Sequence, residues 1–486
     1  MVKRLWTSEK GVLLAWVLIL LGILSIIVVA TLTLVTNQFV MGSRFSSSVK
    51  AFHYAEAGIH HYLAYINSED SSSQGPPLLN EDIAYEDGYY RLEVINDDKS
   101  NEVTIRSTGW PKDPVNEKSD LRTVDVVLKK RSFTEHVYFS DNDGDDIWWT
   151  DGEKCFGPYH TNTTLRVMGR PVFYGPVSYV KNIVYHSSGS NPDFRKGASR
   201  VAPINFPTTN TKLKILAQSD GYLFEGRTSI MLNADGTITI RNKNINNWAP
   251  KKMALPNNGV IYVNGTTSDY DKRFNSGSGN AFVSGTLKGR LTIAASNDIY
   301  ITGKDPTKWI PDKEKNQQGY FDSNQVTPTG GITLAATTFS PVYERNELTG
   351  YKAVGNDILG LVANNYIRIL TRGWFKESGS ENTGILSYPQ NLTIHAALFA
   401  ISKSFENKDY QYYPPSSGKL TLRGALIQKT RGPVGLTSGK GYVKDYAHDS
   451  RMLYDAPPHF LEPEKSGWEV FEWSESRTHL NDSEDN

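Results

Sequence analysis

The chain begins with one long apolar run and continues as a largely polar body. Residues 12–35 contain no charged side chain, and a helix needs about 20 residues to cross a bilayer. Beyond this run, apolar residues recur at three- and four-residue spacing, which predicts that the helix continues with one apolar stripe. The stripe consists of Phe45, Val49, Phe52, Ala55, Ile59, Leu63 and Ile66. We therefore expect one helix over residues 12–68, with its membrane half at 12–35.

Basic residues flank the apolar run on one side. Lys3, Arg4 and Lys10 precede it, and no basic residue follows it until Arg44. Cytoplasmic flanks of membrane helices carry the excess of Lys and Arg, so the N-terminus is expected in the cytoplasm and the body outside. A secretory signal would have a shorter apolar region followed by a small-residue cleavage site. The pattern favours a single-pass segment of the cytoplasmic membrane.

Residues 69–132 are expected to form a small antiparallel sheet. Residues 69–80 break the helix with Ser, Gly and paired Pro, and three strand-like runs follow. The first two runs alternate apolar and polar residues and are separated by the hairpin-like sequence DDKS. Their apolar face would receive the helix stripe, and it includes Leu92, Val94, Val103 and Ile105.

A second pattern, short apolar strands separated by Gly and Asn, covers residues 133–472. Residues 291–301 align with 359–369 without a gap, and residues 392–399 match 420–427. Repeated short strands predict a β-solenoid, in which each coil buries its inward residues against the next. Asn at the corners tolerates left-handed geometry and can stack along successive turns. A β-sandwich remains the alternative, with less internal similarity.

The composition limits the partners and bound groups that can be expected. Lys+Arg and Asp+Glu each number 52, and Cys155 is the single cysteine. The balance gives no global field toward an acidic partner, and one cysteine excludes an intramolecular disulfide and a multi-Cys zinc site. The basic segment KKRSF is too short for nucleic-acid recognition, so no nucleic-acid partner is expected. The acidic residues 473–486 are typical of a disordered tail.

Two N-terminal stretches together resemble the PilX-type minor pilins. They are EKGVLLAWVLILLGILS and AFHYAEAGIHHYLA, the latter with an AEAG block at residues 55–58. These proteins have a short basic leader that ends in a Gly before the cut, here residues 1–11, and then a long apolar helix. The resemblance implies cleavage by a prepilin peptidase between Gly11 and Val12, and packing of the helix with other pilins or pseudopilins. It implies a non-catalytic subunit that contacts membrane lipid through residues 12–35 and reaches the pilus or cell surface after assembly.

The chain departs from the major pilins at two positions. Those proteins usually have Phe after the cut and Glu as the fifth mature residue, where this chain has Val12 and Trp16. The missing Glu argues against a repeating shaft subunit and fits a minor or tip subunit. Residues 157–177 and 424–460 resemble the entry and closing segments of large PilX-like surface proteins. The fold class expected is thus an α+β pilin-like region followed by a large all-β domain. A plain single-pass anchor is the alternative.

One acidic turn could hold a cation. Asp141, Asp143 and Asp145 alternate in SDNDGDDIWW, and hard oxygen ligands at that spacing suit Ca²⁺. The EF-hand pattern fails, because Gly144 is fourth and Gly152 twelfth in the loop. A solvated acidic turn is the plainer interpretation, and no other cofactor is expected.

The second functional hypothesis is a membrane-anchored solenoid that binds or cleaves surface polysaccharide. Aromatic side chains that could stack on sugar rings are Trp148, Trp149, Tyr410, Tyr412 and Tyr413. A lyase would need clustered charged groups, and Arg423, Lys429 and Arg431 are the candidates. His160, beside Thr161 and Asn162, could coordinate or catalyse, although a role in a corner is the plainer interpretation. No nucleophile elbow, P-loop, dinucleotide fingerprint or HExxH motif occurs.

Overall fold

The computed structural model divides the chain into two compact units. The first, here called the stem unit, comprises Met1–Asp98, Glu102–Lys129 and Trp468–Asn486. The second, the β body, comprises Lys99–Asn101 and Lys130–Gly467. In sequence, the β body is therefore inserted into the stem unit. The structure describes residues 9–67, 78–99, 102–112, 121–311, 319–321, 330–370, 391–408, 410, 418–436, 438–464 and 467–476, with backbone alone at 9–12, 96–99, 309–311 and 319–321.

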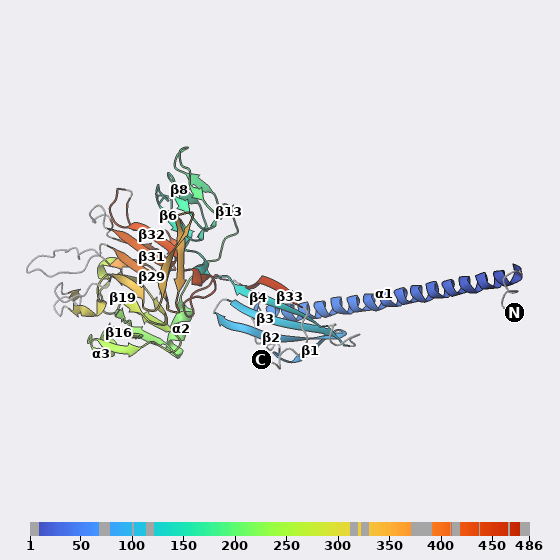
Figure 1. The fold of residues 1–486 in the computed structure, drawn as a ribbon. Helices are drawn as coiled ribbons and strands as arrows, with labels where there is room; N and C mark the ends of the chain where they lie inside the picture. The colour runs from blue at the N-terminus through green and yellow to red at the C-terminus, as the bar shows by residue number, and fades with distance from the viewer. Residues whose placement is uncertain are drawn as a thin grey trace, which may run out of the picture. The chain divides into compact units, whose positions relative to one another are not determined.

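The stem unit consists of one long helix and a five-stranded sheet (Figure 1). The helix α1 runs from Glu9 to Asn67, 59 residues, close to the predicted span of 12–68. The sheet has the order β1-β2-β3-β4-β33. Its strands are β1 (Asp82–Tyr85), β2 (Gly88–Lys99), β3 (Glu102–Pro111), β4 (Arg122–Lys130) and β33 (Trp468–Ser476).

The C-terminal half of α1 packs on this sheet. Ala55 and Ile59 are fully buried against Leu92, Val103 and Ile105, and Phe52, Leu63, Ile66 and Val94 are partly buried in the same cluster. These residues of the predicted stripe and sheet face therefore meet. The N-terminal end of the stripe was predicted wrongly: Phe45 is 73% exposed and Val49 is 38% exposed. The helix still contacts the sheet at Ser48, whose hydroxyl accepts from Arg122 of β4, so the exposure of Val49 reflects the direction of its side chain.

The fifth strand of this sheet comes from the end of the chain. β33 pairs beside β4, and the Asn67 amide donates to the Trp468 carbonyl over 2.9 Å. Residues 473–476 belong to β33, so the prediction of a tail from residue 473 was wrong there. Likewise, 468–472 belong to the stem unit and not to the preceding β domain. Residues 477–486 lie outside the described residues. Charged residues alternating with Trp468, Val470 and Phe471 concealed an edge strand.

The β body is built on parallel strand ladders, labelled in part in Figure 1. Parallel pairs need long crossovers, and here each crossover passes through the other ladders. Ladder 1 consists, in spatial order, of β14 (Tyr222–Glu225), β18 (Val260–Asn264), β20 (Arg290–Ala295), β27 (Ile358–Ala363), β29 (Leu392–Ala400), β31 (Lys419–Thr430), β5 (Tyr138–Asn142), β7 (Tyr159–Thr161), β10 (Val177–Tyr179) and β13 (Ala198–Arg200).

Two further ladders complete the parallel pairing. Ladder 2 consists of β15 (Thr228–Leu232), β19 (Ala281–Leu287), β21 (Ile299–Thr302), β28 (Ile367–Leu370) and β30 (Phe405–Glu406). Ladder 3 runs from β19 through β24 (Gly331–Leu334), β29, β31, β32 (Val443–His448), β6 (Lys154–Phe156) and β9 (Val172–Phe173) to β12 (Asp193–Phe194). Strands β19, β29 and β31 each belong to two ladders.

The spatial order of ladder 1 is not the order of the sequence. β5, near the start of the body, pairs with β31 near its end, so the N-terminal strands extend the ladder from its C-terminal side. Strand β31 changes ladder at Gly424, whose φ of +154° favours glycine; a side chain there would meet the backbone of Ala396. The pairing of β5 with β31 therefore joins strands almost 300 residues apart in sequence.

Smaller elements lie around the ladders. Antiparallel strands are β16 (Thr237–Asn242) and β17 (Lys251–Ala254) beside β15, β22 (Trp309–Pro311) with β23 (Gly319–Phe321), and β25 (Thr338–Glu344) with β26 (Glu347–Val354). β8 (Leu165–Val167) pairs parallel with β11 (Ile183–Tyr185). Helices are α2 (Thr211–Ser219), α3 (Lys243–Asn246) and the 3₁₀ turns η2 (Phe133–Glu135), η3 (Tyr270–Lys272), η4 (Pro306–Lys308) and η6 (Ser450–Leu453).

Both gapless self-alignments correspond to the register of neighbouring strands. Leu291 pairs with Leu359 and Ile299 with Ile367, on ladders 1 and 2 respectively. Leu392 pairs with Leu420 in the same way. Buried Leu, Ile, Val and Ala of all three ladders form one apolar core, which explains why the inward positions repeat. A long apolar helix and a large β-rich domain are thus present as expected.

Candidate functional site

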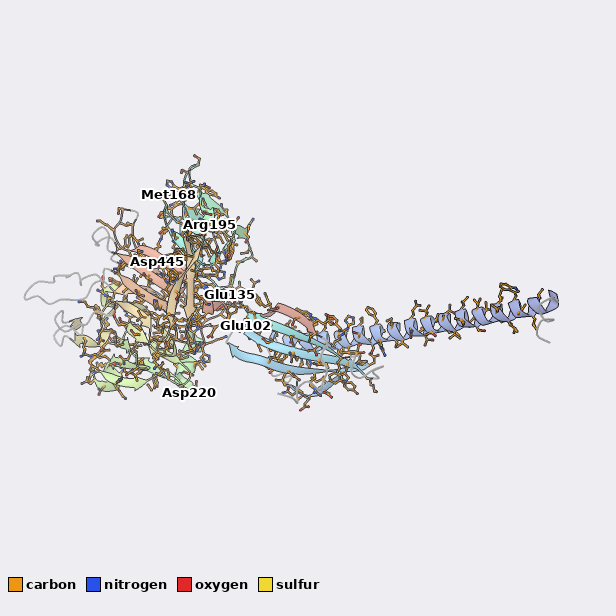
Figure 2. All side chains as sticks on the ribbon, viewed as in Figure 1. Glu102, Glu135, Met168, Arg195, Asp220 and Asp445 are labelled. Carbon is orange, nitrogen blue, oxygen red and sulfur yellow. The ribbon has the colours of Figure 1, made fainter. Side chains whose placement is uncertain are left out.

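The predicted processing pair lies within the described helix. Gly11 and Val12 fall inside α1, whose first residue is Glu9. From residue 13 onward the helix is long and apolar enough to cross a membrane by length and composition. Trp16, where the major pilins have Glu, is 67% exposed. Figure 2 shows the side chains of this half of α1 projecting on all sides.

The AEAG block is a close-packing surface. Ala51 and Ala55 pack so tightly on β3 that a side chain at Gly109 would meet their backbone atoms. One helical turn further, a side chain at Gly58 would meet Ser107 and Tyr90 of the sheet. Small residues at positions 51, 55 and 58 share one helix face by their spacing. The block therefore sets how closely α1 approaches its own sheet.

The three alternating aspartates do not converge. Asp141 accepts from Lys429 Nζ over 2.6 Å and from the Asn162 amide over 2.6 Å. Asp145, with a side chain 90% exposed, pairs with Arg166 over 2.5 Å. Asp143 is fully buried in the interior. In the part of the chain that the structure describes, no group of three or more His, Cys, Asp or Glu side chains could hold a metal ion.

Asp143 belongs to a buried ion pair. Its Oδ2 lies 3.3 Å from Arg431 Nη1 and accepts from the Tyr159 hydroxyl over 2.9 Å, while its Oδ1 accepts from Ser140. Burial raises the pKa of Tyr159 well above its usual range, so its hydroxyl remains a donor. The Arg431 guanidinium also lies 4.8 Å from the Trp149 ring. This constellation joins the two ends of the β body and is structural.

The aromatic residues predicted to contact sugar are dispersed. Trp149 is 1% exposed and packs in the core, so it cannot stack on a ligand, and its prediction was wrong. Trp148 is partly buried, with its ring edge-on to His186 at 5.1 Å. Tyr410 is partly buried, whereas Tyr412 and Tyr413 lie outside the described residues. Apolar rings followed by Thr and Asp resembled a surface turn, but one of the two indoles faces inward.

The basic residues proposed for a lyase are each paired separately. Arg423 forms an ion pair with Asp445, labelled in Figure 2, over 3.1 Å. Lys429 and Arg431 pair with different aspartates, as described above. His160 is buried, stacks on Phe139 at 4.7 Å and bonds Ser178 and Asn162. Burial lowers its pKa. These residues do not meet in one site.

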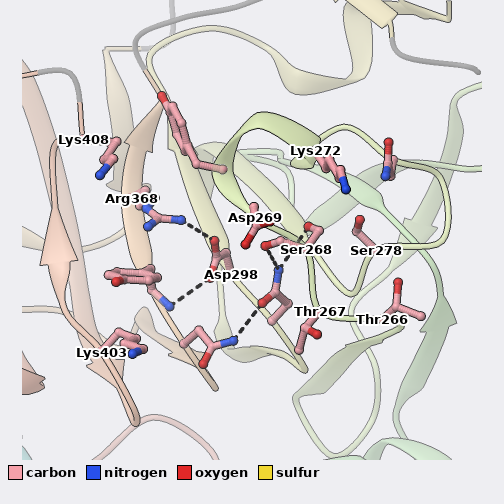
Figure 3. A pocket seen from close by; sticks show the side chains of 15 residues that line it. Thr266, Thr267, Ser268, Asp269, Lys272, Ser278, Asp298, Arg368, Lys403 and Lys408 are labelled. Atoms are coloured by element: carbon pink, nitrogen blue, oxygen red, sulfur yellow. Dashed lines mark hydrogen bonds and ion pairs between the residues drawn. The ribbon is translucent and has the colours of Figure 1, made fainter. Parts of the chain in front are cut away.

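A different region, without a signal in the sequence, forms a cavity of about 630 Å³. It lies where ladder 1 turns into ladder 2, on the corners after β18, β20, β27 and β29 (Figure 3). A volume of this order suits a small ligand or one segment of a polymer. Its lining is almost wholly polar: Thr266, Thr267, Ser268, Asp269, Tyr270, Lys272, Asn275, Ser278, Asn297, Asp298, Asn365, Tyr366, Arg368, Lys403 and Lys408.

An asparagine ladder supports the wall of this cavity. The Asn297 amide donates to Asn280 Oδ1 over 2.7 Å, and Asn365 donates to Asn297 Oδ1 over 2.8 Å. The predicted stacking of Asn at successive corners is confirmed here. Left-handed geometry is not the reason, because neither Asn297 nor Asn365 has a positive φ. Side-chain amides suit these corners because each can donate to one neighbour and accept from the next.

Beside the ladder, a charged network fixes Arg368. Its Nη1 donates to Asp298 Oδ2 over 2.6 Å and its Nε donates to Glu406 Oε1 over 2.8 Å. Asp298 also accepts from the Tyr300 hydroxyl and the Tyr366 backbone N–H. Burial raises the pKa of Asp298, although Arg368 opposes the shift. Because two carboxylates bind one guanidinium, the network holds Arg368 in place.

Comparison with protein families matches residues 102–181 to the domain of unknown function DUF4900. This match covers β3, β4 and the first strands of the β body, less than half of the chain. No curated protein matches. Among solved structures, the chain is similar to the competence-associated pilin ComZ from Thermus thermophilus, with 10% identity, 89% of this chain and 98% of that chain covered, and a TM-score of 0.22. A TM-score that low does not establish a shared fold.

Proposed function

We propose that this chain is a non-catalytic, pilin-like subunit that is held in the cytoplasmic membrane before assembly and then displays its β body on a filament. The carrying observation is the division of α1. Its N-terminal part, from Leu13 to Phe45, exposes apolar side chains on every face, and its C-terminal part packs on the sheet of the stem unit.

The length of the helix supports both roles. At 1.5 Å per residue, 59 residues extend about 90 Å, roughly three times the hydrocarbon thickness of a bilayer. An anchor alone needs about 20 of them. A helix that leaves the bilayer with its apolar faces uncovered requires other apolar helices around it. Stems of neighbouring subunits would replace the lipid contacts.

We further propose a minor or tip position. Trp16 offers no carboxylate to neutralise the terminal amine of an adjacent subunit, a role attributed to Glu in the major pilins. The mature N-terminus would be Val12. A subunit that starts or ends a filament needs fewer such contacts than a repeating shaft subunit. The filament is either a pilus or a secretion pseudopilus.

The β body is proposed to be a β-solenoid. Three parallel ladders that share β19, β29 and β31 support this, as do the one-to-one register of the repeats and the asparagine ladder. A rigid solenoid suits display, because each coil is held by its neighbours along the whole body. Cleavage of polysaccharide is not proposed, since the charged residues that would perform it are separately ion-paired.

Processing provides the test. The N-terminal mass of the full chain would be measured in cells with and without prepilin peptidase. We expect an end at Val12 that depends on the peptidase, and loss of that end in a Gly11→Leu variant. Gly22→Leu is the matched control, since a side chain at Gly22 meets nothing within 4 Å. An intact leader in both strains would contradict assembly as a pilin.

Assembly can be tested separately by cross-linking. Cys155 is the single cysteine of the chain and is buried, so a cysteine introduced on α1 is the accessible thiol. We expect Leu24→Cys to form oxidative adducts with other pilins in sheared filaments. A cysteine at Lys212, exposed on the β body, should form none. Equal adducts from both positions would argue against packing through α1.

A further inference from the structure

We propose that the cavity at the corner of ladders 1 and 2 binds an acidic polysaccharide. The inference goes beyond filament assembly and can be tested on the purified chain, so its failure would leave the processing result unaffected. It rests on three features of the cavity: its uncompensated lysines, its hydroxyl and amide lining, and its shape.

The charge of the cavity is positive once the internal pairs are removed. Its lining has four basic side chains and two acidic ones. Asp298 and Glu406 are both committed to Arg368. Lys272, Lys403 and Lys408 are exposed, and within the described ranges none has a carboxylate partner. Three ammonium groups then face the single carboxylate of Asp269.

The lysines come from separate parts of the sequence and surround one opening. Lys272 ends η3, Lys403 follows β29 and Lys408 follows β30. Figure 3 shows Lys272 on one side of the cavity, Lys403 and Lys408 on the other, and Ser268 and Asp269 between them. Like charges repel, so their convergence favours an anionic occupant. Mobile ammonium groups suit carboxylate or phosphate oxygens as point charges.

The remaining lining fits a hydroxylated chain. Thr266 and Thr267 present hydroxyls, and Asn275 presents an amide at the same surface. Such groups both donate and accept, as sugar hydroxyls do. The supporting ladder of Asn297 and Asn365 is already bonded internally, so the wall keeps its geometry before a ligand arrives. Preorganised polar groups reduce the ordering cost of binding.

The aromatic rings argue for a saccharide over a nucleic acid. Single-stranded nucleic acids are bound by stacking bases on free aromatic faces. Here the Tyr366 ring has the Arg368 guanidinium 3.7 Å from its centroid, and the Tyr270 ring has Arg273 at 4.0 Å. Guanidinium groups already occupy faces of both rings. The cavity would therefore recognise its ligand through hydrogen bonds and ion pairs and not through base stacking.

The experiment measures binding of the full chain, purified in detergent, to immobilised polymers. Polygalacturonate carries carboxylates, poly(glycerol phosphate) carries phosphates, and dextran is neutral. We expect binding to at least one acidic polymer, weakened by salt because the ion pairs are exposed, and no binding to dextran. The acidic polymer that binds more tightly shows whether the cavity prefers carboxylate or phosphate groups. Equal binding to dextran would overturn the proposal, as would tighter binding of single-stranded DNA.

Variants locate the binding in the cavity. The triple variant K272Q/K403Q/K408Q should bind the acidic polymer about tenfold more weakly or worse, since three exposed ion pairs are lost. The control K212Q/K288Q/K352Q removes equal charge at exposed lysines that do not line the cavity, and should bind normally. Thr267→Trp obstructs part of the cavity from an exposed position without changing charge, and should also weaken binding. Unchanged binding by T267W, or equal losses in both triple variants, would show diffuse attraction and overturn the assigned site.

Discussion

Arg431 Nη1 lies 3.3 Å from Asp143 Oδ2, and the two side chains are buried although 288 residues separate them in sequence. The pair lies where β5, from the beginning of the β body, joins β31, from its end. Asp143 seemed a surface ligand in the sequence because it stands in an acidic turn. Because it lies beside Arg431, it forms an ion pair between the N-terminal and C-terminal segments of the β body.

Removal of one partner of this pair should destabilise the β body. Arg431→Met leaves the Asp143 carboxylate buried without its cation, which typically costs about 3–5 kcal/mol. Adding Asp143→Asn to that variant should recover part of the loss, because the uncompensated charge is gone. Equilibrium denaturation of the three chains would measure it. Asp145→Asn, on the exposed pair with Arg166, is the control and should cost about 0.5 kcal/mol or less.

The asparagine ladder should be most sensitive at its centre. Asn297→Ala removes a donor to Asn280 and an acceptor for Asn365, so we expect a loss of about 2–3 kcal/mol in unfolding free energy. Asn365→Ala, at the end of the ladder, removes one of these bonds and should cost about 1 kcal/mol. Equal losses of unfolding free energy at both positions would mean that the number of amide hydrogen bonds removed does not determine the effect. Thermal and denaturant unfolding would both report it.

Acid should weaken the β body through His395. Its ring packs on Phe339 at 4.6 Å, and its Nδ1 is buried without a hydrogen-bond partner among the described residues. Burial, and next the charge of Arg423, lowers the pKa of His395 to about 4. The folded pKa lies below the unfolded value of about 6.5, so the unfolded chain binds the proton first and stability falls as pH drops between them.

The variant His395→Gln should reduce this pH dependence. We expect the unfolding free energy of the native chain to fall more between about pH 7 and pH 5 than that of the variant. His186→Gln, at an exposed position, should follow the native chain. Parallel curves for the native chain and H395Q would rule out His395 as a source of acid sensitivity. Burial lowers the pKa of His136 and of His160 too. Some pH dependence of the unfolding free energy is therefore expected to remain in the variant.

Close packing of α1 on its sheet should depend on Gly109. Gly109→Val places a side chain against the backbone of Ala51 and Ala55, which cannot rotate away, and should cost about 3 kcal/mol by overpacking. Limited proteolysis of the stem unit would then proceed faster at Lys50. Gly42→Val is the control: it lies on α1, at a position where a side chain meets nothing within 4 Å. A resistant G109V chain would mean that the helix can shift on the sheet.

Local patterns succeeded wherever one interaction repeats at short range. The apolar run and stripe located α1 to within a few residues, because helix periodicity is a property of neighbouring positions. The match of 291–301 with 359–369 gave the register of β20 with β27, since stacked strands with equivalent inward positions are selected for the same residue types. The stacking of Asn side chains at successive corners could be predicted for the same reason, because equivalent positions carry the same residue type.

Predictions failed where the environment of a residue depends on segments that are distant in sequence. Whether Trp149 faces solvent depends on Arg431 and Phe173, which approach it from other strands and turns of the β body. Residues 473–476 became strand because β4 offered an edge to them. The cavity lysines are unremarkable singly: Lys272 and Lys408 are 136 positions apart in the printed numbering, and only the ladders bring them to one opening.

The sequence by itself therefore determined the long apolar helix, the β-rich body, the repeat register and the small residues of the AEAG block. Each depends on periodicity or residue size, which act between near neighbours in sequence or between paired strands with equivalent inward positions. Tertiary structure alone decided which aspartate is buried, which strand closes the stem sheet and where the uncompensated lysines gather. Those outcomes depend on long-range pairing such as β5 with β31, whose partners carry no shared local pattern that would reveal them.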